Sequence, residues 1–234
     1  MVLAALLSGA LCMRPLEGQT SGVARPDLSD RGTFELSVAG KSIGTERFQI
    51  RVRSDQIEAQ GDVLLRREEN GKSIQLRTSS TLLLGSQFNP LSYTWNQKGA
   101  QSSELSIDFR AQPAEARYRT LNGQNERRNF KLEKGVVVLD DNVIHHYQLA
   151  LAHYDQVKGG AQGFRAFIPQ EALPGEINII FMGDESVNIE WGKRMLRRFL
   201  LTTENAQISL WVDPEGRLQM MSAPGAQFQA VRKR

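Results

Sequence analysis

From residue 32 onwards, apolar and polar residues alternate through most of the chain, and turn-forming residues separate the alternating stretches. Phe34–Val38 places an apolar residue at every second position, and Phe48–Val52 repeats this pattern. A period of two is typical of β-strands that bury one face. The pairs Asn70-Gly71 and Asn122-Gly123 favour two-residue hairpin turns. The sequence therefore predicts a long antiparallel meander of about ten to twelve strands.

The alternation stops at Asp140, where one stretch has the period of an α-helix. Asp140, Asp141 and Asn142 are residue types that cap helix N-termini. An apolar stripe at helical spacing follows, formed by Val143, Tyr147, Ala150, Leu151 and Tyr154. We therefore expect one helix over about residues 141–155, ended by the glycine pair 159–160. One helix beside a long sheet predicts a mainly β fold, in which the meander curls into a half-barrel or open barrel around a central helix.

The first thirty residues differ from the rest of the chain. Val2–Met13 is an uncharged apolar run of about the length of a signal-peptide core, and it is too short to span a bilayer. We expect residues 1–30 to be a signal-like apolar segment with a disordered lead, and residues 31–234 to form a single β-rich domain. The protein is then exported, to the periplasm or the outer envelope. Signal cleavage and lipidation of Cys12, the one cysteine, stay open because no basic residue precedes the run.

Charge and hydropathy narrow the range of partners. The net charge of +3 comes from 29 basic and 26 acidic residues that interleave along the chain. Nucleic-acid binders concentrate their basic residues on one face, so we expect no nucleic-acid partner. No later segment approaches the eighteen consecutive apolar residues of a membrane helix, so we expect no transmembrane span in the mature chain.

All three histidines, His145, His146 and His153, lie in one nine-residue stretch of the predicted helix. His146 and His153 would lie about 10 Å apart along the helix axis, and His145 and His146 would point about 100° apart. Such pairs cannot share one metal ion. No G-x-S-x-G motif is present. We therefore expect no metal, no cofactor and no assignable catalytic residue, and the histidines are interpreted as hydrogen-bonding to the sheet or facing solvent.

The sheet–helix–sheet order and the closing strand–turn–strand of residues 208–218 resemble those of uncharacterised, exported bacterial β-rich proteins. Their expected form is an unclosed barrel like that of the periplasmic lipoprotein carriers (LolA/LolB-like). The resemblance is one of pattern and covers about residues 32–231. It implies an apolar concave face for acyl chains or for an apolar segment of a partner. It supplies no catalytic residues.

The sequence thus predicts a non-enzymatic protein that binds a lipid-like or other apolar ligand, or an envelope protein, on a concave sheet. The tentative ligand-binding residues are Tyr147, Leu151, Tyr154, Trp95 and Trp191. One alternative is a structural or interaction module whose helix leaves no ligand cavity. The other is a hydrolase that uses His145, His146 or His153 together with a carboxylate of the sheet.

Overall fold

A computed structural model of the chain describes residues 28–69, 72–99, 102–119, 123–140 and 142–234. The signal-like run with Cys12, the Asn70-Gly71 pair, Asn122 and Asp141 lie outside these residues. The strands are β1 Asp30–Val38, β2 Lys41–Val52, β3 Gln56–Glu69, β4 Lys72–Gly85, β5 Pro90–Lys98, β6 Ser103–Asp108, β7 Ala114–Arg119, β8 Asn125–Phe130, β9 Val137–Val138, β10 Ala161–Ile168, β11 Leu173–Ile189, β12 Gly192–Thr202, β13 Gln207–Val212, β14 Leu218–Ala223 and β15 Phe228–Arg232. The helices are α1 His145–Leu151 and the short 3-10 helix η1 Pro224–Ala226.

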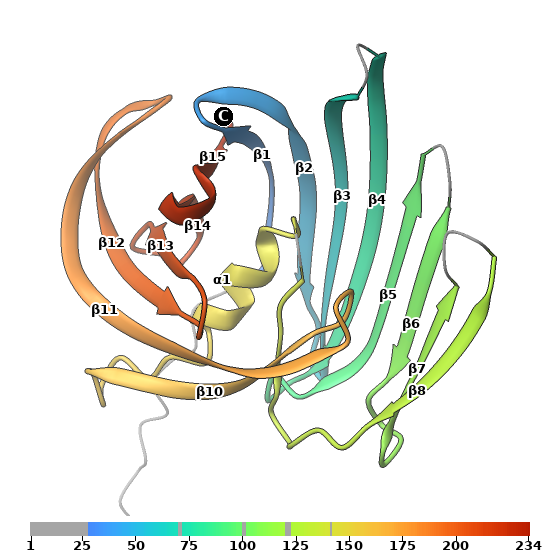
Figure 1. Cartoon of the computed structure of the whole chain (residues 1–234). Helices are drawn as coiled ribbons and strands as arrows, with labels where there is room; N and C mark the ends of the chain where they lie inside the picture. Colours follow the sequence, from blue (N-terminus) through green and yellow to red (C-terminus); the bar gives the residue numbers. More distant parts are fainter. Residues whose placement is uncertain (1–27, 70–71, 100–101, 120–122, 141) are drawn as a thin grey trace, which may run out of the picture.

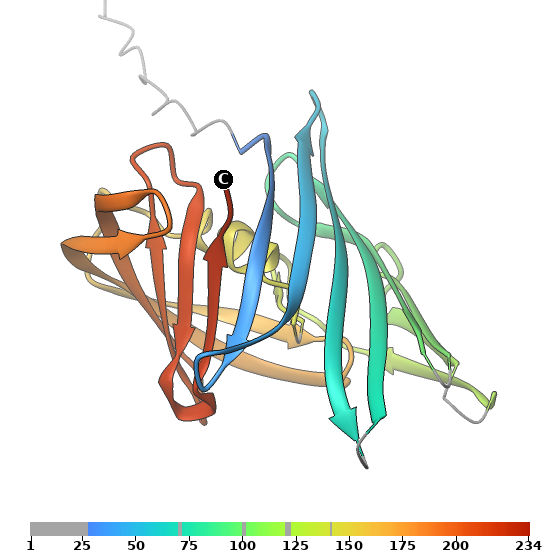
Figure 2. The ribbon, with the colours of Figure 1, turned by 90° about the horizontal axis from the view of Figure 1, so that it is seen from above.

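The described strands form one fifteen-stranded sheet in the order β8-β7-β6-β5-β4-β3-β2-β1-β15-β14-β13-β12-β11-β10-β9. Strands that follow one another in the chain pair antiparallel, with two exceptions: β8 and β9 do not pair with each other, and the two-residue β9 pairs parallel with β10. The two halves of the sheet join where β1 pairs with β15, visible as the blue and red strands side by side in Figure 2. The predicted meander and mainly β fold are therefore confirmed.

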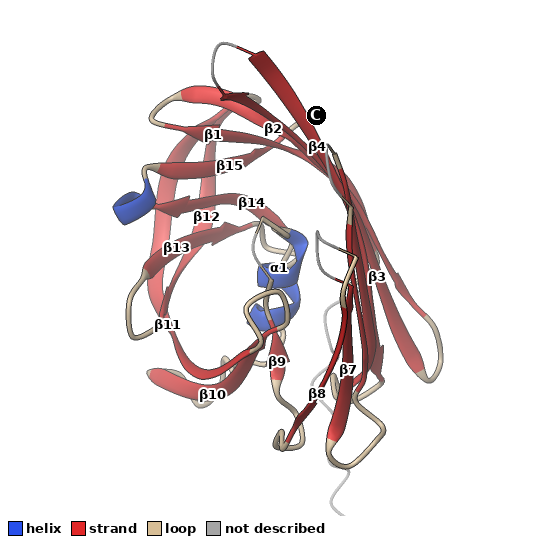
Figure 3. Cartoon of the chain, turned by 45° about the vertical axis from the view of Figure 1, so that its right-hand side comes forward, coloured by secondary structure: helices blue, strands red, loops and turns tan. Residues whose placement is uncertain are grey.

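The sheet curls around α1 without closing into a barrel, because β8 and β9 lie at its two ends. The helix lies inside the curve of the sheet (Figures 1 and 3). The strand count exceeds the predicted ten to twelve. Strand β8 (NERRNF) has no apolar alternation and takes its place by pairing with β7. The two-residue β9 is too short to give a sequence pattern.

Alternating residues of the strands face α1 and form the core. Phe34, Ile50, Leu82 and Leu210 are almost completely buried on this inner face. The alternation ceases to predict burial at strand ends, and Val52 is 44% exposed because it lies at the last position of β2. Among the helices of the described residues, none combines the length and the apolarity needed to cross a bilayer.

The helix is shorter than predicted, since α1 covers residues 145–151 instead of about 141–155. The side chain of Asp140 does not cap it. That carboxylate accepts hydrogen bonds from the Tyr93 hydroxyl at 2.6 Å and from the Gln170 backbone N–H at 3.2 Å. Asn142 has a φ of 60°, outside the right-handed helical region. The stripe that predicted a longer helix reflects burial in turns on both sides of α1.

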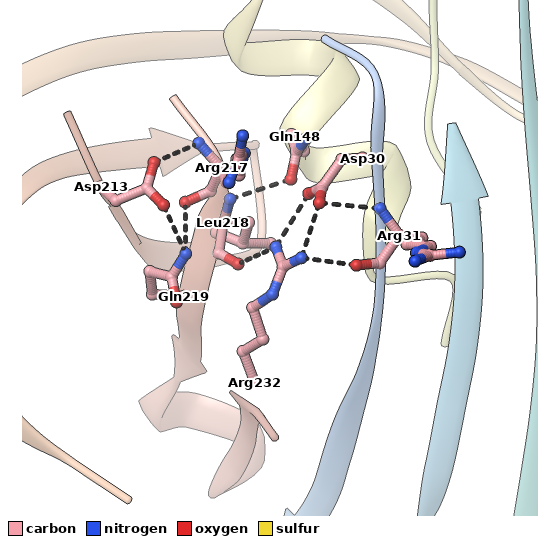
Figure 4. Close-up of polar contacts among 8 residues, drawn as sticks. All are labelled: Asp30, Arg31, Gln148, Asp213, Arg217, Leu218, Gln219 and Arg232. Atoms are coloured by element: carbon pink, nitrogen blue, oxygen red, sulfur yellow. Dashed lines mark hydrogen bonds and ion pairs between the residues drawn. The ribbon is translucent and has the colours of Figure 1, made fainter. Parts of the chain in front are cut away.

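A buried ion pair joins the two ends of the described chain. The Arg232 guanidinium on β15 binds both carboxylate oxygens of Asp30 on β1, at 2.6 and 2.8 Å, and donates to the carbonyl oxygens of Arg31 and Leu218 (Figure 4). Gln148 of α1 accepts a hydrogen bond from the Leu218 backbone N–H at 2.9 Å. These contacts tie β1, β14, β15 and α1 together where the two halves of the sheet meet.

The far end of the β11–β12 hairpin lies against the outer face of the sheet. Strand β12 pairs with β13 only from Arg197 onwards. The preceding Leu196 packs with Trp211 and Met220 in a second, smaller apolar cluster. Beyond it, Lys233 forms ion pairs with Glu190 of the hairpin at 3.2 Å and with Glu35 of β1 at 2.6 Å. The outer face of β1 and β15 is therefore bordered by the hairpin end.

Candidate functional site

Five polar side chains meet between α1 and the inner face of the sheet. We call them the buried polar cluster: Glu46, Tyr93, Asp140, His145 and His146. Each is at most 2% exposed. They come from β2, β5, the segment before α1 and α1 itself, so the cluster connects the helix to two separate parts of the sheet.

The first half of the cluster joins Glu46 to the start of α1. One carboxylate oxygen accepts a hydrogen bond from the Ile144 backbone N–H at 2.8 Å, and the other lies 2.6 Å from Nδ1 of His145. Both contacts of the Glu46 carboxylate are within hydrogen-bonding distance. The ring of Phe48 stacks on the imidazole, with a centroid distance of 5.8 Å and an interplanar angle of 4°. Glu46 thus satisfies an orphan N–H at the helix start and fixes the orientation of the imidazole.

A glycine makes room for this pair. Gly61 lies on β3 beside Phe48 of β2. A Cβ atom there would lie 2.6 Å from Cε1 of His145 and 3.1 Å from Oε1 of Glu46. Any other residue at this position would displace the imidazole or the carboxylate. The absence of a side chain at Gly61 is therefore a condition for the Glu46–His145 contact.

The second half of the cluster is built on Tyr93. Burial raises the pKa of Tyr93 well above its usual value, and the nearby charge of Asp140 raises it further. The Tyr93 hydroxyl donates its hydrogen bond to the Asp140 carboxylate. His146 packs edge-on against Tyr93, with a centroid distance of 5.7 Å. Burial, and secondarily the neighbouring His145, lowers the pKa of His146 well below its usual value. His146 is therefore a neutral, apolar-packed ring at neutral pH.

The third histidine lies apart from the buried polar cluster. His153 follows α1 and contacts the rings of Phe88 and Phe164, with centroid distances of 5.4 and 5.9 Å. Burial lowers the pKa of His153 to about 4. His145 and His146 do touch each other, with a centroid distance of 4.8 Å. The three histidines that lie close together in the sequence therefore occupy two separate environments.

The five predicted ligand-binding residues do not form one site. Tyr147 and Leu151 are the two residues of α1 that are not buried, and Tyr154 is buried with its hydroxyl donating to the Gly160 carbonyl oxygen at 2.9 Å. Trp95 lies on β5 at an inward-facing position, because its strand neighbour Tyr93 two residues away belongs to the core. Trp191 lies in the turn between β11 and β12. The sheet therefore separates Trp191 from the other four residues.

Apolar side chains continue along the inner face of the sheet past the buried polar cluster. Leu65 of β3 pairs with Leu76 of β4, and both are half-buried. Trp95 is also half-buried and packs against the edge of the core. We call Leu65, Leu76 and Trp95 the concave strip. Leu65 and Leu76 were not predicted as ligand-binding residues, because strand alternation marks the inward face without showing how far along each strand the core extends.

The outer face of β4 to β8 carries a different surface, a groove of about 630 Å³ lined by hydroxyl, amide and charged side chains. Its outward-facing residues include Thr94, Asn96, Glu104, Arg119 and Arg127. Inward-facing residues such as Trp95 and Leu105 supply its floor. This polar outer groove is chemically unlike the concave strip on the other side of the same strands.

Comparison with known proteins identifies the fold. No family model matches the chain, and no curated protein matches it significantly. Among solved structures, a β-barrel-like protein of the domain of unknown function DUF1849 from Brucella abortus is similar, with a TM-score of 0.60 and 7% identity over 87% of this chain and 94% of that one. A DUF1089 family protein from Pseudomonas aeruginosa has a TM-score of 0.47 and 11% identity, over 77% of this chain and 90% of that one. The similarity to the Brucella abortus protein shows a shared β-barrel-like fold.

Proposed function

We propose that this protein is a non-enzymatic binding protein of the cell envelope that holds an acyl chain or another apolar ligand on the concave face of its sheet. The observation that carries the proposal is the concave strip. Leu65 and Leu76 lie side by side past the buried polar cluster, and Trp95 lies further along the same face, opposite Ser80, with Thr78 between. All three stay half-buried. A ligand that covered them would remove apolar surface from water, which contributes about 25 cal/mol per Å² before ordering costs.

The helix supports the same proposal. Its residues His145, His146, Gln148, Leu149 and Ala150 are buried. Tyr147 and Leu151, one turn apart, are the two that are not, and both are largely apolar. An apolar surface on α1 therefore accompanies the apolar surface on the sheet, which suits an elongated ligand such as an acyl chain. The lipoprotein-carrier resemblance and the signal-like run Val2–Met13 agree with export to the envelope.

A second candidate is an interaction module without a ligand, and the packing of α1 favours it. The middle of the concavity is filled by the buried polar cluster and by the rings of Phe34 and Phe48, which stack 5.2 Å apart. A hydrolase is the weaker alternative. A general base must reach the substrate proton, while Glu46 and His145 are completely buried. We therefore assign the Glu46–His145 pair to the architecture of the protein.

Titration with a fluorescent fatty acid tests the proposal. Leu76→Gln places an amide in the concave strip, and Leu83→Gln makes the same change on the outer face of the same strand, where Leu83 is also half-buried. We expect saturable binding that Leu76→Gln weakens roughly fivefold, a difference near 1 kcal/mol, and that Leu83→Gln leaves unchanged. Absence of binding by the unaltered protein, or equal loss in both variants, contradicts the proposal.

A further inference from the structure

The outer face of β1, β2 and β15 carries a hollow of about 560 Å³, which we call the basic groove. Its lining includes Arg31, Thr33, Arg47, Trp191, Lys233 and Arg234. Phe34 and Phe48 face the core, so their strand neighbours Thr33 and Arg47 face outward. The groove therefore opens on the side of the sheet away from α1 and from the concave strip.

Part of the positive charge of the basic groove is compensated within the protein, because Arg232, which also lines the groove, is paired with Asp30. Lys233 is paired with Glu35 and Glu190. In the part of the chain that the structure describes, the side chains of Arg31 and Arg47 form no ion pair, and both residues are exposed. A second hollow of about 580 Å³ adjoins the groove, shares Arg31 with it and adds Arg217. Arg31 and Arg47 are therefore the cations of this surface for which a partner would supply negative charge.

The groove also holds an unused hydrogen-bond donor. Nε1 of Trp191 is buried and has no hydrogen-bond partner among the described residues. Buried indole N–H groups are normally hydrogen-bonded, so an acceptor oxygen brought by a ligand would satisfy it. Tryptophan also prefers the level of the lipid headgroups at a membrane surface. A phospholipid headgroup supplies both acceptor oxygens and negative charge at the level of the membrane surface that tryptophan prefers.

The position of the groove in the chain points to the same partner. The described chain enters the domain at Leu28 and continues into β1, which forms one side of the groove. The apolar run Val2–Met13 precedes Leu28 by fourteen residues in the sequence. Fourteen extended residues span at most about 50 Å. A bilayer that receives the apolar run therefore lies within reach of the basic groove.

We propose that the basic groove docks the protein on the anionic phospholipid headgroups of a membrane surface, with Arg31 and Arg47 facing phosphates and Trp191 at headgroup level. The proposal is independent of the apolar ligand, because the groove and the concave strip lie on opposite faces of the sheet. Docking in this orientation leaves the concave face turned away from the membrane.

Co-sedimentation of the full chain with vesicles tests the docking. One set contains phosphatidylglycerol with phosphatidylcholine, and the other contains phosphatidylcholine alone. The groove variant is Arg31→Gln/Arg47→Gln. The matched control is Arg119→Gln/Arg127→Gln, which removes two exposed strand arginines from the polar outer groove on β7 and β8. Each arginine near an anionic surface contributes roughly fivefold in affinity. We therefore expect the groove variant to bind anionic vesicles at least about tenfold more weakly than the unaltered protein. The control should stay within about twofold of the unaltered protein.

Three results would overturn the docking proposal. They are equal binding of the groove variant and the unaltered protein to anionic vesicles, equal loss in the groove variant and the control, and displacement by millimolar inorganic phosphate beyond the effect of ionic strength, which would assign the groove to free anions. Binding to neutral vesicles measures the contribution of the apolar run Val2–Met13, which all forms share, and is the baseline for each comparison. Vesicle binding by Trp191→Phe is a second test, which leaves the arginines in place. It removes the indole N–H and keeps a ring, and we expect about threefold weaker binding to anionic vesicles. Unchanged binding by this variant, with circular dichroism confirming its fold, also contradicts the proposal.

Discussion

Glu46 and His145, ninety-nine positions apart in the sequence, lie 2.6 Å from each other in the centre of the protein, and neither is exposed to solvent. Glu46 belongs to β2, and His145 is the first residue of α1, the helix inserted between the two halves of the sheet. Their contact fixes where α1 sits against the inner face. The histidines that first marked a candidate site therefore mark the point where the helix is attached.

Removal of the Glu46 carboxylate should destabilise the fold strongly. Glu46→Ala removes the acceptor of the Ile144 N–H and leaves Nδ1 of His145 buried without its partner, and breaking a buried pair in this way costs about 3–5 kcal/mol. Glu46→Gln keeps one acceptor oxygen, so we expect a smaller loss. Urea denaturation measures both. The control is Glu126→Gln, because Glu126 is exposed and pairs with Arg128 at the surface. A free energy of unfolding that falls no further in Glu46→Ala than in this control would refute the anchoring role.

The space at Gly61 gives an independent prediction. Gly61→Ala inserts a Cβ atom within 2.6 Å of the His145 ring, and overpacking of this kind typically costs about 1–3 kcal/mol. Gly175→Ala on β11 has no atom within 4 Å of the new Cβ and serves as the matched control. Thermal unfolding should separate the two variants clearly. Equal midpoints would mean that the imidazole moves aside freely and that the cluster is not rigid.

Acid should destabilise the protein through its buried histidines. The pKa of His153 is lowered to about 4 in the folded state, while the unfolded chain takes up this proton near pH 6.5. The unfolded state therefore binds more protons, and the contribution is present above pH 6.5 and is lost as the pH falls towards 4. The loss for His153 is about 3 kcal/mol. Denaturation measures the free energy of unfolding at pH 7 and at pH 4. From pH 7 to pH 4 this free energy should fall less in His153→Phe than in the unaltered protein, by the amount given above. Equal decreases in the two proteins would contradict the prediction.

The strand pattern was predictable because each strand carries its own signal. Phe34 and Phe48 face the core as their alternation predicts. The pairing of β1 with β15, which joins the two halves of the sheet, has no local signal. It depends on contacts such as the one between Asp30 and Arg232, 202 positions apart. The open curl was predicted correctly, and the way in which its halves join was not.

The candidate site was less predictable than the fold. Glu46 shares the inward parity of Phe48 and Ile50, so a carboxylate among core positions is the sequence signal that could have indicated the site. The identity of its partner depended on where α1 begins, and the capping residues placed that start four residues too early. Asp140 is used by Tyr93 instead of by the helix. Tertiary contacts, which local sequence does not encode, decided both points.

Native mass spectrometry of the purified full chain tests the central claim most directly. If the concave strip holds an apolar ligand, the protein should carry co-purifying lipid of acyl-chain mass, and Leu76→Gln should lose most of it while Leu83→Gln retains it. A protein that is free of bound lipid as purified, and that stays free after incubation with fatty acid, would contradict the claim and leave the interaction module as the better account.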